Sequence, residues 1–92
     1  MKFSQETAVQ KAKEDLAQRL GVAANEIEEV SVSETDFPDM SLGAPVDDEM
    51  SAQMISTGWK INLNANGKDY EYRGDKYQLR LRGFDGANYK IG

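Results

Sequence analysis

The stretch WKINLNANGKDYEYRGDKYQLRLR, residues 59–82, decides the fold of this 92-residue chain. From Trp59 to Asn64 apolar and polar side chains alternate strictly, which is the two-residue period of a strand with one buried face. Asn66-Gly67 predicts a tight hairpin turn, because both residues tolerate positive φ. A further turn is expected at Gly74-Asp75, so the stretch predicts an antiparallel meander. Its apolar face should carry Tyr70, Tyr72, Tyr77, Leu79 and Leu81.

The segment before the meander has the signals of one amphipathic helix. Ser4 is a suitable N-cap, and Gly21 stands where a left-handed C-cap is expected. Between them apolar residues recur at helical spacing: Val9, Ala12, Leu16 and Leu20. Because a helix and a sheet that each have one apolar face must bury those faces together, the sequence predicts a single α+β domain over residues 1–92. We expect one N-terminal helix packed on a single antiparallel β-sheet meander.

A further strand is expected between the helix and the meander. The run IEEVSVSETDF, residues 27–37, is rich in the β-branched residues that favour strands. Its apolar residues fall in two phases, with Val30 and Val32 on one face and Ile27 and Phe37 on the other. A bulge or break near residues 33–35 would reconcile them. A short strand is also predicted over MSAQMIS, residues 50–56.

The composition excludes most catalytic chemistry. The chain has no histidine and no cysteine, so imidazole proton transfer, thiol catalysis and zinc sites built from these residues are absent. We therefore expect a protein that is not an enzyme and needs no cofactor. Without disulfides and without an apolar signal segment, the chain as written is expected in the cytoplasm, and outside it if a signal peptide has been removed. No segment has the length and apolar character needed for membrane insertion.

The charge distribution bears on nucleic-acid binding. The net charge of −5 repels polyanions, which argues against a nucleic-acid partner. Basic residues do alternate with the tyrosines of the meander, as on platforms that bind single strands. The alternation favours tyrosines in the core, which leaves only a basic outer face on an acidic protein. The tripeptide Arg73-Gly74-Asp75 has the letters of an adhesion signal, but turn chemistry explains it as well.

The loop FPDMSLGAPVDDEM, residues 37–50, holds both prolines of the chain. In a structural interpretation, the prolines stiffen the loop while Met40 and Leu42 pack on the sheet and close one end of the core. In a functional interpretation, the stiffened loop presents its apolar run to a protein partner, as small protease inhibitors do, at little entropic cost. Burial of Met40 and Leu42 would favour the first, and exposure the second. The candidate binding residues are Phe37, Asp39, Met40, Ser41, Leu42, Gly43 and Ala44.

Acidic residues of the same region supply the oxygen ligands that Ca²⁺ accepts. They match no EF-hand spacing, so calcium binding is a hypothesis set against ordinary solvated surface. These residues are Asp36, Asp39, Asp47, Asp48 and Glu49.

Three motifs resemble those of a group of small bacterial secreted or lipoprotein-borne domains of uncharacterised function. Residues 19–22, RLGV, match the end of that group's helix. Residues 37–45, FPDMSLGAP, resemble W-P-D-x-S-L-G-C-P, and residues 67–73, GKDYEYR, resemble G-x-x-Y-x-Y-H. The tryptophan, cysteine and histidine of the pattern are replaced here by Phe37, Ala44 and Arg73, so a disulfide of that group is absent. The pattern is also loosely similar to PepSY domains, and that similarity implies a role in peptidase control.

These observations lead to two expectations about function. The first is a noncatalytic binding module, in its specific form a peptidase inhibitor or regulator, acting through the Pro-bounded loop 37–50. The alternative is a structural or accessory domain that self-associates or docks on a larger protein. In either case we expect a protein partner, and a monomer or a weak homodimer.

Overall fold

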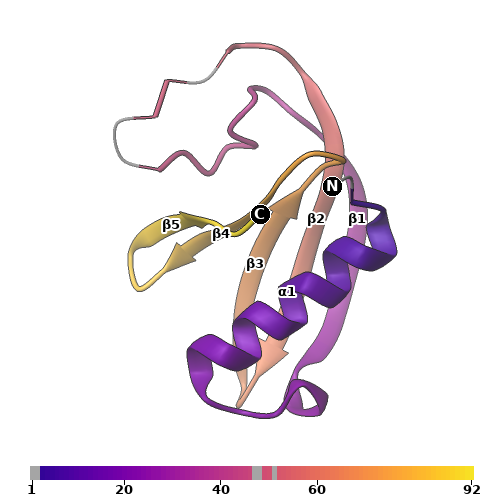
Figure 1. The fold of residues 1–92 in the computed structure, drawn as a ribbon, viewed down its shortest axis with the longest axis vertical. Coiled ribbons are helices and arrows are strands. Elements are labelled where there is room, and N and C mark those ends of the chain that lie inside the picture. Colours follow the sequence, from indigo (N-terminus) through magenta and orange to yellow (C-terminus); the bar gives the residue numbers. More distant parts are fainter. Residues whose placement is uncertain (1–2, 47–48, 51) are drawn as a thin grey trace.

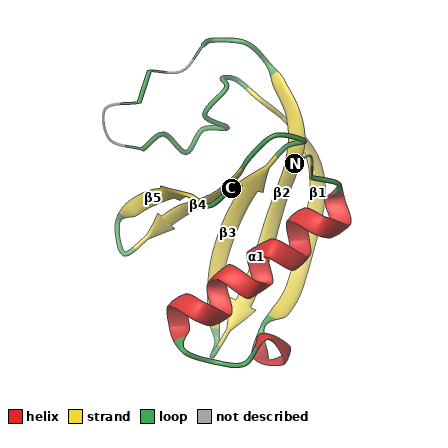
Figure 2. Ribbon diagram, in the orientation of Figure 1, coloured by secondary structure: helices red, strands yellow, loops and turns green. Residues whose placement is uncertain are grey.

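The computed structural model describes residues 3–46, 49–50 and 52–92. In these ranges the chain forms a helix, α1 (Gln5–Leu20), a short 3₁₀ turn, η1 (Ala24–Glu26), and a sheet. The strands of the sheet are β1 (Glu28–Phe37), β2 (Ser56–Ala65), β3 (Lys68–Gly74), β4 (Leu79–Phe84) and β5 (Ala87–Lys90). Neighbouring strands are antiparallel and follow chain order, and α1 lies diagonally across one face (Figure 1, Figure 2). The predicted α+β fold, a helix packed on an antiparallel meander, is confirmed.

Both predicted ends of α1 are confirmed. Ser4 Oγ accepts a hydrogen bond from the Thr7 N–H at 3.2 Å, and Thr7 Oγ1 accepts one from the Ser4 N–H at 2.8 Å. At the other end Gly21 takes the left-handed conformation, with φ 68°, and the Val22 N–H donates to the Ala17 carbonyl oxygen. Among the described residues, no helix is long and apolar enough to cross a membrane.

The main core lies between α1 and the sheet. From the helix it takes small and branched side chains, and from the strands large ones: Ala8, Val9, Ala12, Leu16 and Ala17 face Ile61, Leu63, Tyr72, Leu79 and Leu81. The hydroxyl of Tyr72 donates to Asp15 Oδ2 of α1 at 2.7 Å. Burial and this hydrogen bond raise the pKa of Tyr72 above its ordinary value. Because Ile61, Leu63 and Tyr72 all face α1, the alternation predicted for the strands on either side of Asn66-Gly67 is confirmed.

Tyr77 was expected on the core face, and that prediction is wrong. Tyr77 is 67% exposed, whereas Tyr72 is buried and Tyr70 packs against the core. The reason is the turn before β4: Asp75 Oδ1 accepts the N–H groups of both Tyr77 and Gln78, at 2.8 and 3.0 Å. The alternation of β4 begins only at Leu79, so it does not fix the side of Tyr77.

The predicted bulge in β1 exists, but it lies elsewhere. The register of β1 against β2 shifts between Glu29 and Ser31, not near residues 33–35. The extra residue there is Val30, which is 55% exposed, whereas Val32 packs at the margin of the main core. The bulge thus leaves Val30 exposed, while Val32 contacts the main core. Phe37 pairs with Ser56, in the phase that points away from α1.

The strands differ from the prediction in two further places. Residues 52–55 form no strand, and β2 begins at Ser56; Ser51 lies outside the described residues. β1 ends at Phe37, the predicted end of its run, because Pro38 has no N–H to continue the ladder. A strand that was not predicted, β5, follows the turn at Asp85-Gly86, where both residues have positive φ. That Asp-Gly pair is a hairpin signal in its own right.

Candidate functional site

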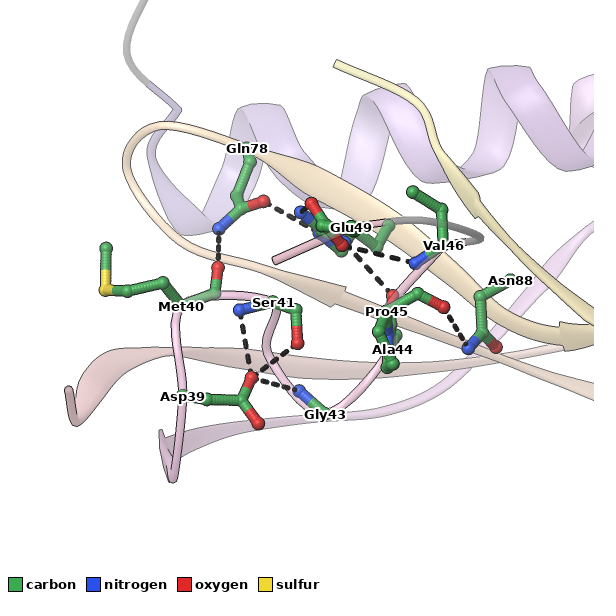
Figure 3. A network of polar contacts seen from close by, with 11 residues as sticks. Asp39, Met40, Ser41, Gly43, Ala44, Pro45, Val46, Glu49, Gln78 and Asn88 are labelled. Atoms are coloured by element: carbon green, nitrogen blue, oxygen red, sulfur yellow. Dashed lines mark hydrogen bonds and ion pairs between the residues drawn. The ribbon is translucent and has the colours of Figure 1, made fainter. Parts of the chain in front are cut away.

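Residues 38–46, which we call the strap, cover part of the outer face of the sheet, the face away from α1. Arg73 of β3 and Arg80 of β4 are cross-strand partners on this face. Side chains of the sheet and its turns donate hydrogen bonds to four carbonyl oxygens of the strap. Figure 3 shows the bonds to Met40, Ala44 and Pro45. The pairs are Gln78 Nε2 to Met40 at 2.6 Å, Arg73 Nη1 to Leu42 at 3.0 Å, Arg80 Nη1 to Ala44 at 3.1 Å and Asn88 Nδ2 to Pro45 at 2.9 Å.

Arg80 is the centre of this arrangement and is only 2% exposed. Its Nη1 and Nη2 donate to the two carboxylate oxygens of Glu49, and its Nε donates to Gln78 Oε1 at 2.7 Å. The hydrogen bonds from Arg80 lower the pKa of Glu49 to about 2. Because no buried side-chain nitrogen or oxygen of the described residues lacks a partner, the burial of this cation is compensated.

The turn inside the strap is built by Asp39. Its Oδ1 accepts hydrogen bonds from the Ser41 N–H at 2.9 Å, the Ser41 hydroxyl at 2.5 Å and the Gly43 N–H at 3.3 Å (Figure 3). The Ser41 hydroxyl, followed by the Gly43 N–H, holds the pKa of Asp39 below its ordinary value. Leu42 and Gly43 both have positive φ, and a Cβ at position 43 would collide with the Arg73 guanidinium. These contacts explain the D-x-S-L-G spacing in physical terms.

The strap covers a second, smaller core. Leu42 and Ala44 are 0% exposed, Phe37 and Ser41 are buried, and none of them belongs to the main core. The Arg73 guanidinium lies over the Phe37 ring, 5.6 Å from its centroid. Of the predicted binding residues, Met40 keeps the largest exposure, at 36%. The burial of Leu42 favours the structural interpretation of the loop. The loop leaves Met40 at the surface.

The basic outer face is used within the molecule. Arg73 and Arg80 hold the strap, while Arg82 remains exposed. The Asp75 carboxylate is buried and also accepts the Ser56 hydroxyl at 2.8 Å. Neither a continuous basic stripe nor a displayed Arg-Gly-Asp tripeptide is therefore present in the described residues.

The acidic residues considered for calcium have other partners. Asp39 accepts hydrogen bonds from backbone N–H groups of the strap, and Glu49 accepts hydrogen bonds from Arg80. Asp36 accepts a hydrogen bond from the Thr57 hydroxyl at 2.7 Å. Asp47 and Asp48 lie outside the described residues. Elsewhere in the described ranges, no three acidic side chains come close enough to hold a metal ion.

A hollow of about 490 Å³ lies beside Met40, at the end of the sheet where β2 begins. We call it the apolar hollow, because large apolar side chains form much of its lining: Met40, Met54, Ile55, Trp59 and Tyr77. Glu34, Asp75 and Lys76 add polar groups. Sequence reasoning missed this site because it placed Met54 and Ile55 in a strand and Tyr77 in the core.

Comparison with known proteins gives one finding. The model of a family described as a domain of unknown function, DUF8738, matches residues 9–82, from the first turns of α1 into β4. No curated protein and no solved structure matches the chain. The matched range includes the strap and the apolar hollow.

Proposed function

Because the chain belongs to the DUF8738 family, whose description names no activity, we propose a function from the geometry of the molecule. We propose that it is a noncatalytic binding module that takes an apolar segment of another protein into the apolar hollow. One observation carries the proposal. Among the described residues six large apolar side chains are exposed, and four of them, Met40, Met54, Ile55 and Tyr77, line this one hollow. Soluble proteins seldom gather exposed apolar side chains in this way without a binding role.

The strap gives the hollow a fixed shape. Gln78 holds the Met40 carbonyl oxygen, and the Met40 N–H donates to the Ala52 carbonyl oxygen at 3.0 Å. The second bond ties the segment that carries Met54 and Ile55 to the strap. A rim that is already positioned loses little entropy on binding, while methionine side chains adapt to the shape of the ligand. Loop 37–50 thus serves binding by placing Met40.

The groups near the hollow support a noncatalytic role. With no histidine or cysteine in the chain, the candidates for acid–base chemistry there are carboxylates, a lysine and the Tyr77 hydroxyl. Asp75 accepts hydrogen bonds from the Ser56 hydroxyl and two backbone N–H groups, which leaves it little capacity to act as a base. Of the remaining groups, Glu34 and Lys76 suit recognition of a charged residue beside the apolar segment.

In the specific form of this proposal, the protein partner is a peptidase that the module inhibits or regulates. Because Leu42 and Ala44 are buried, such an inhibitor would use Met40 and the hollow rather than the whole apolar run. A panel of serine, cysteine, aspartic and metallopeptidases tests this form. If saturating protein changes the rate of none of them, the inhibitor form is refuted while the binding module stands.

A peptide-display library selected on the intact protein tests the binding module itself. Ile55→Asp should weaken the selected peptides at least 10-fold, because it places a charge in the lining without touching a strand. Val30→Asp is the matched control, since Val30 is exposed and lies outside the hollow, and it should leave affinity unchanged. Trp59, the single tryptophan, reports binding by its fluorescence. Equal affinity of both variants would refute the proposal.

The alternative is that two copies bury their hollows against each other. The same exposed apolar side chains favour it, because self-association would remove them from water. Sedimentation velocity at several concentrations decides between the two. A strict monomer at the highest concentration would refute self-association, and a dimer lost in Ile55→Asp would support it.

A further inference from the structure

The outer edge of β1 is open. β1 is the first strand of the sheet, with β2 on one side. Within the part of the chain that the structure describes, no turn or loop backbone hydrogen bond involves Glu28–Phe37. From Ser31 to Phe37 its register against β2 is regular, so its other edge offers a regular row of donors and acceptors. Such a row is a template for an added strand.

A groove of about 410 Å³ runs between α1 and β1, on the side of the sheet that α1 covers. Val9 and Val32 give it an apolar lining, and Glu6, Lys13 and Glu29 stand around it. Every second side chain of a strand added to β1 would point to this side of the sheet. Further along the same strand, Glu34 belongs to the lining of the apolar hollow. The groove and the hollow therefore both adjoin β1.

The charge of this edge selects the occupant. β1 carries four carboxylates and no cation: Glu28, Glu29, Glu34 and Asp36. Glu6 adds a fifth at the groove, and Lys13, at 3.8 Å from Glu29, is the cation that faces them there. A second copy pairing through β1 would set like charges opposite one another, which is unfavourable. A basic segment gains from the same charges.

We propose that β1 takes up an extended basic segment of a protein partner by strand addition. Apolar side chains of the segment lie in the groove against Val9 and Val32, and its lysine or arginine side chains face Glu29 and Glu34. The inference rests on the proposed function, because it names the chemical class of partner whose neighbouring residues reach the apolar hollow.

The probe is the acetylated, amidated peptide Thr-Lys-Thr-Val-Thr-Lys-Thr, whose valine and two lysines share one side of the strand, as Val32, Glu29 and Glu34 do on β1. The same peptide with glutamate in place of lysine is its counterpart. Within residues 31–37, we expect the lysine peptide to slow exchange of the amides that point away from β2 at least 10-fold, and the glutamate peptide to have no effect. Glu34→Lys should weaken binding at least 5-fold. Asp69→Lys, an equal charge change at an exposed position of β3, should change it less than 2-fold. Equal loss in the two variants would refute the inference.

N-methylation of the probe separates strand addition from simple charge attraction. An added strand uses the N–H groups of alternate residues only, so methylating one alternate set should abolish binding and methylating the other should preserve it. If both methylated peptides bind like the parent, strand addition is refuted. Two results together separate the two proposals. If Ile55→Asp no longer binds the display-selected peptides, and the lysine peptide leaves amide exchange of β1 in the native protein unchanged, the binding module stands and the strand-addition site is refuted.

Discussion

Replacing Arg80 by methionine tests the forces that hold the strap. The change keeps much of the side-chain volume but removes the bidentate pair with Glu49 and the donors to Gln78 Oε1 and the Ala44 carbonyl oxygen. Breaking a buried ion pair from one side costs about 3–5 kcal/mol. The Glu49 side chain is 19% exposed, so water recovers part of that cost. We expect the free energy of unfolding to fall by about 3 kcal/mol.

A double-mutant cycle isolates the pair. Glu49→Gln keeps the shape of the side chain but removes its charge, and should cost about 1.5 kcal/mol. Because the Glu49 carboxylate loses its guanidinium partner when Arg80 is gone and keeps the hydrogen bond from the Val46 N–H, the combined variant should lose roughly 1–2 kcal/mol less than the sum of the single changes. Urea unfolding followed by Trp59 fluorescence measures all the variants. Arg80→Met within 0.5 kcal/mol of the native protein, with additive single changes, would refute this account of the strap.

The same pair predicts a pH dependence. Because the folded state lowers the pKa of Glu49 from 4.5 to about 2, the unfolded chain binds more protons between these values. The stabilisation is therefore complete above pH 4.5 and is lost as the pH falls toward 2. Glu49→Gln should lose less stability than the native protein across this window. Parallel pH profiles of the two proteins would contradict the assignment.

Three further predictions concern single residues. Leu42→Asp should cost more than 3 kcal/mol, because it buries a carboxylate in the small core, whereas Met40→Asp should cost less than about 1 kcal/mol; similar urea midpoints for the two would contradict the difference in burial. Gly43→Ala should cost about 2 kcal/mol, since its φ is 69° and the added methyl group meets a guanidinium, and an unchanged melting temperature would exclude that strain. Tyr72→Phe should cost about 1 kcal/mol through the lost hydrogen bond to Asp15, which a thermal melt checks.

The parts of the fold that could be predicted are those with local causes. The capping pair at Ser4, the left-handed Gly21 and the Asn66-Gly67 turn each fix the backbone through neighbouring residues. The alternation around Ile61 then requires a cover for one face, which the amphipathic helix supplies. These features determine the arrangement of helix and sheet without knowledge of distant contacts.

The candidate site depended on contacts that the sequence does not reveal. The strap is held by Arg73 and Arg80, which lie 31 and 36 residues along the chain from the carbonyl groups they bind. Alternation alone shows these residues only as a basic face. Tyr77 follows the phase of its strand in the sequence, but the Asp75 turn sets its direction. The proline pair did point to a stiffened loop. What it could not indicate is that the loop covers a small core and leaves Met40 beside the hollow.

Thiol labelling distinguishes a strap that buries Leu42 and leaves Met40 at the surface from a loop that exposes both residues. Because the chain has no cysteine, Met40→Cys and Leu42→Cys each introduce a single reporter. Under native conditions Met40→Cys should react with a thiol reagent at nearly the rate of a free thiol. Leu42→Cys should react at least 100-fold more slowly, and only as fast as the strap opens. Equal rates in the folded protein would contradict the account.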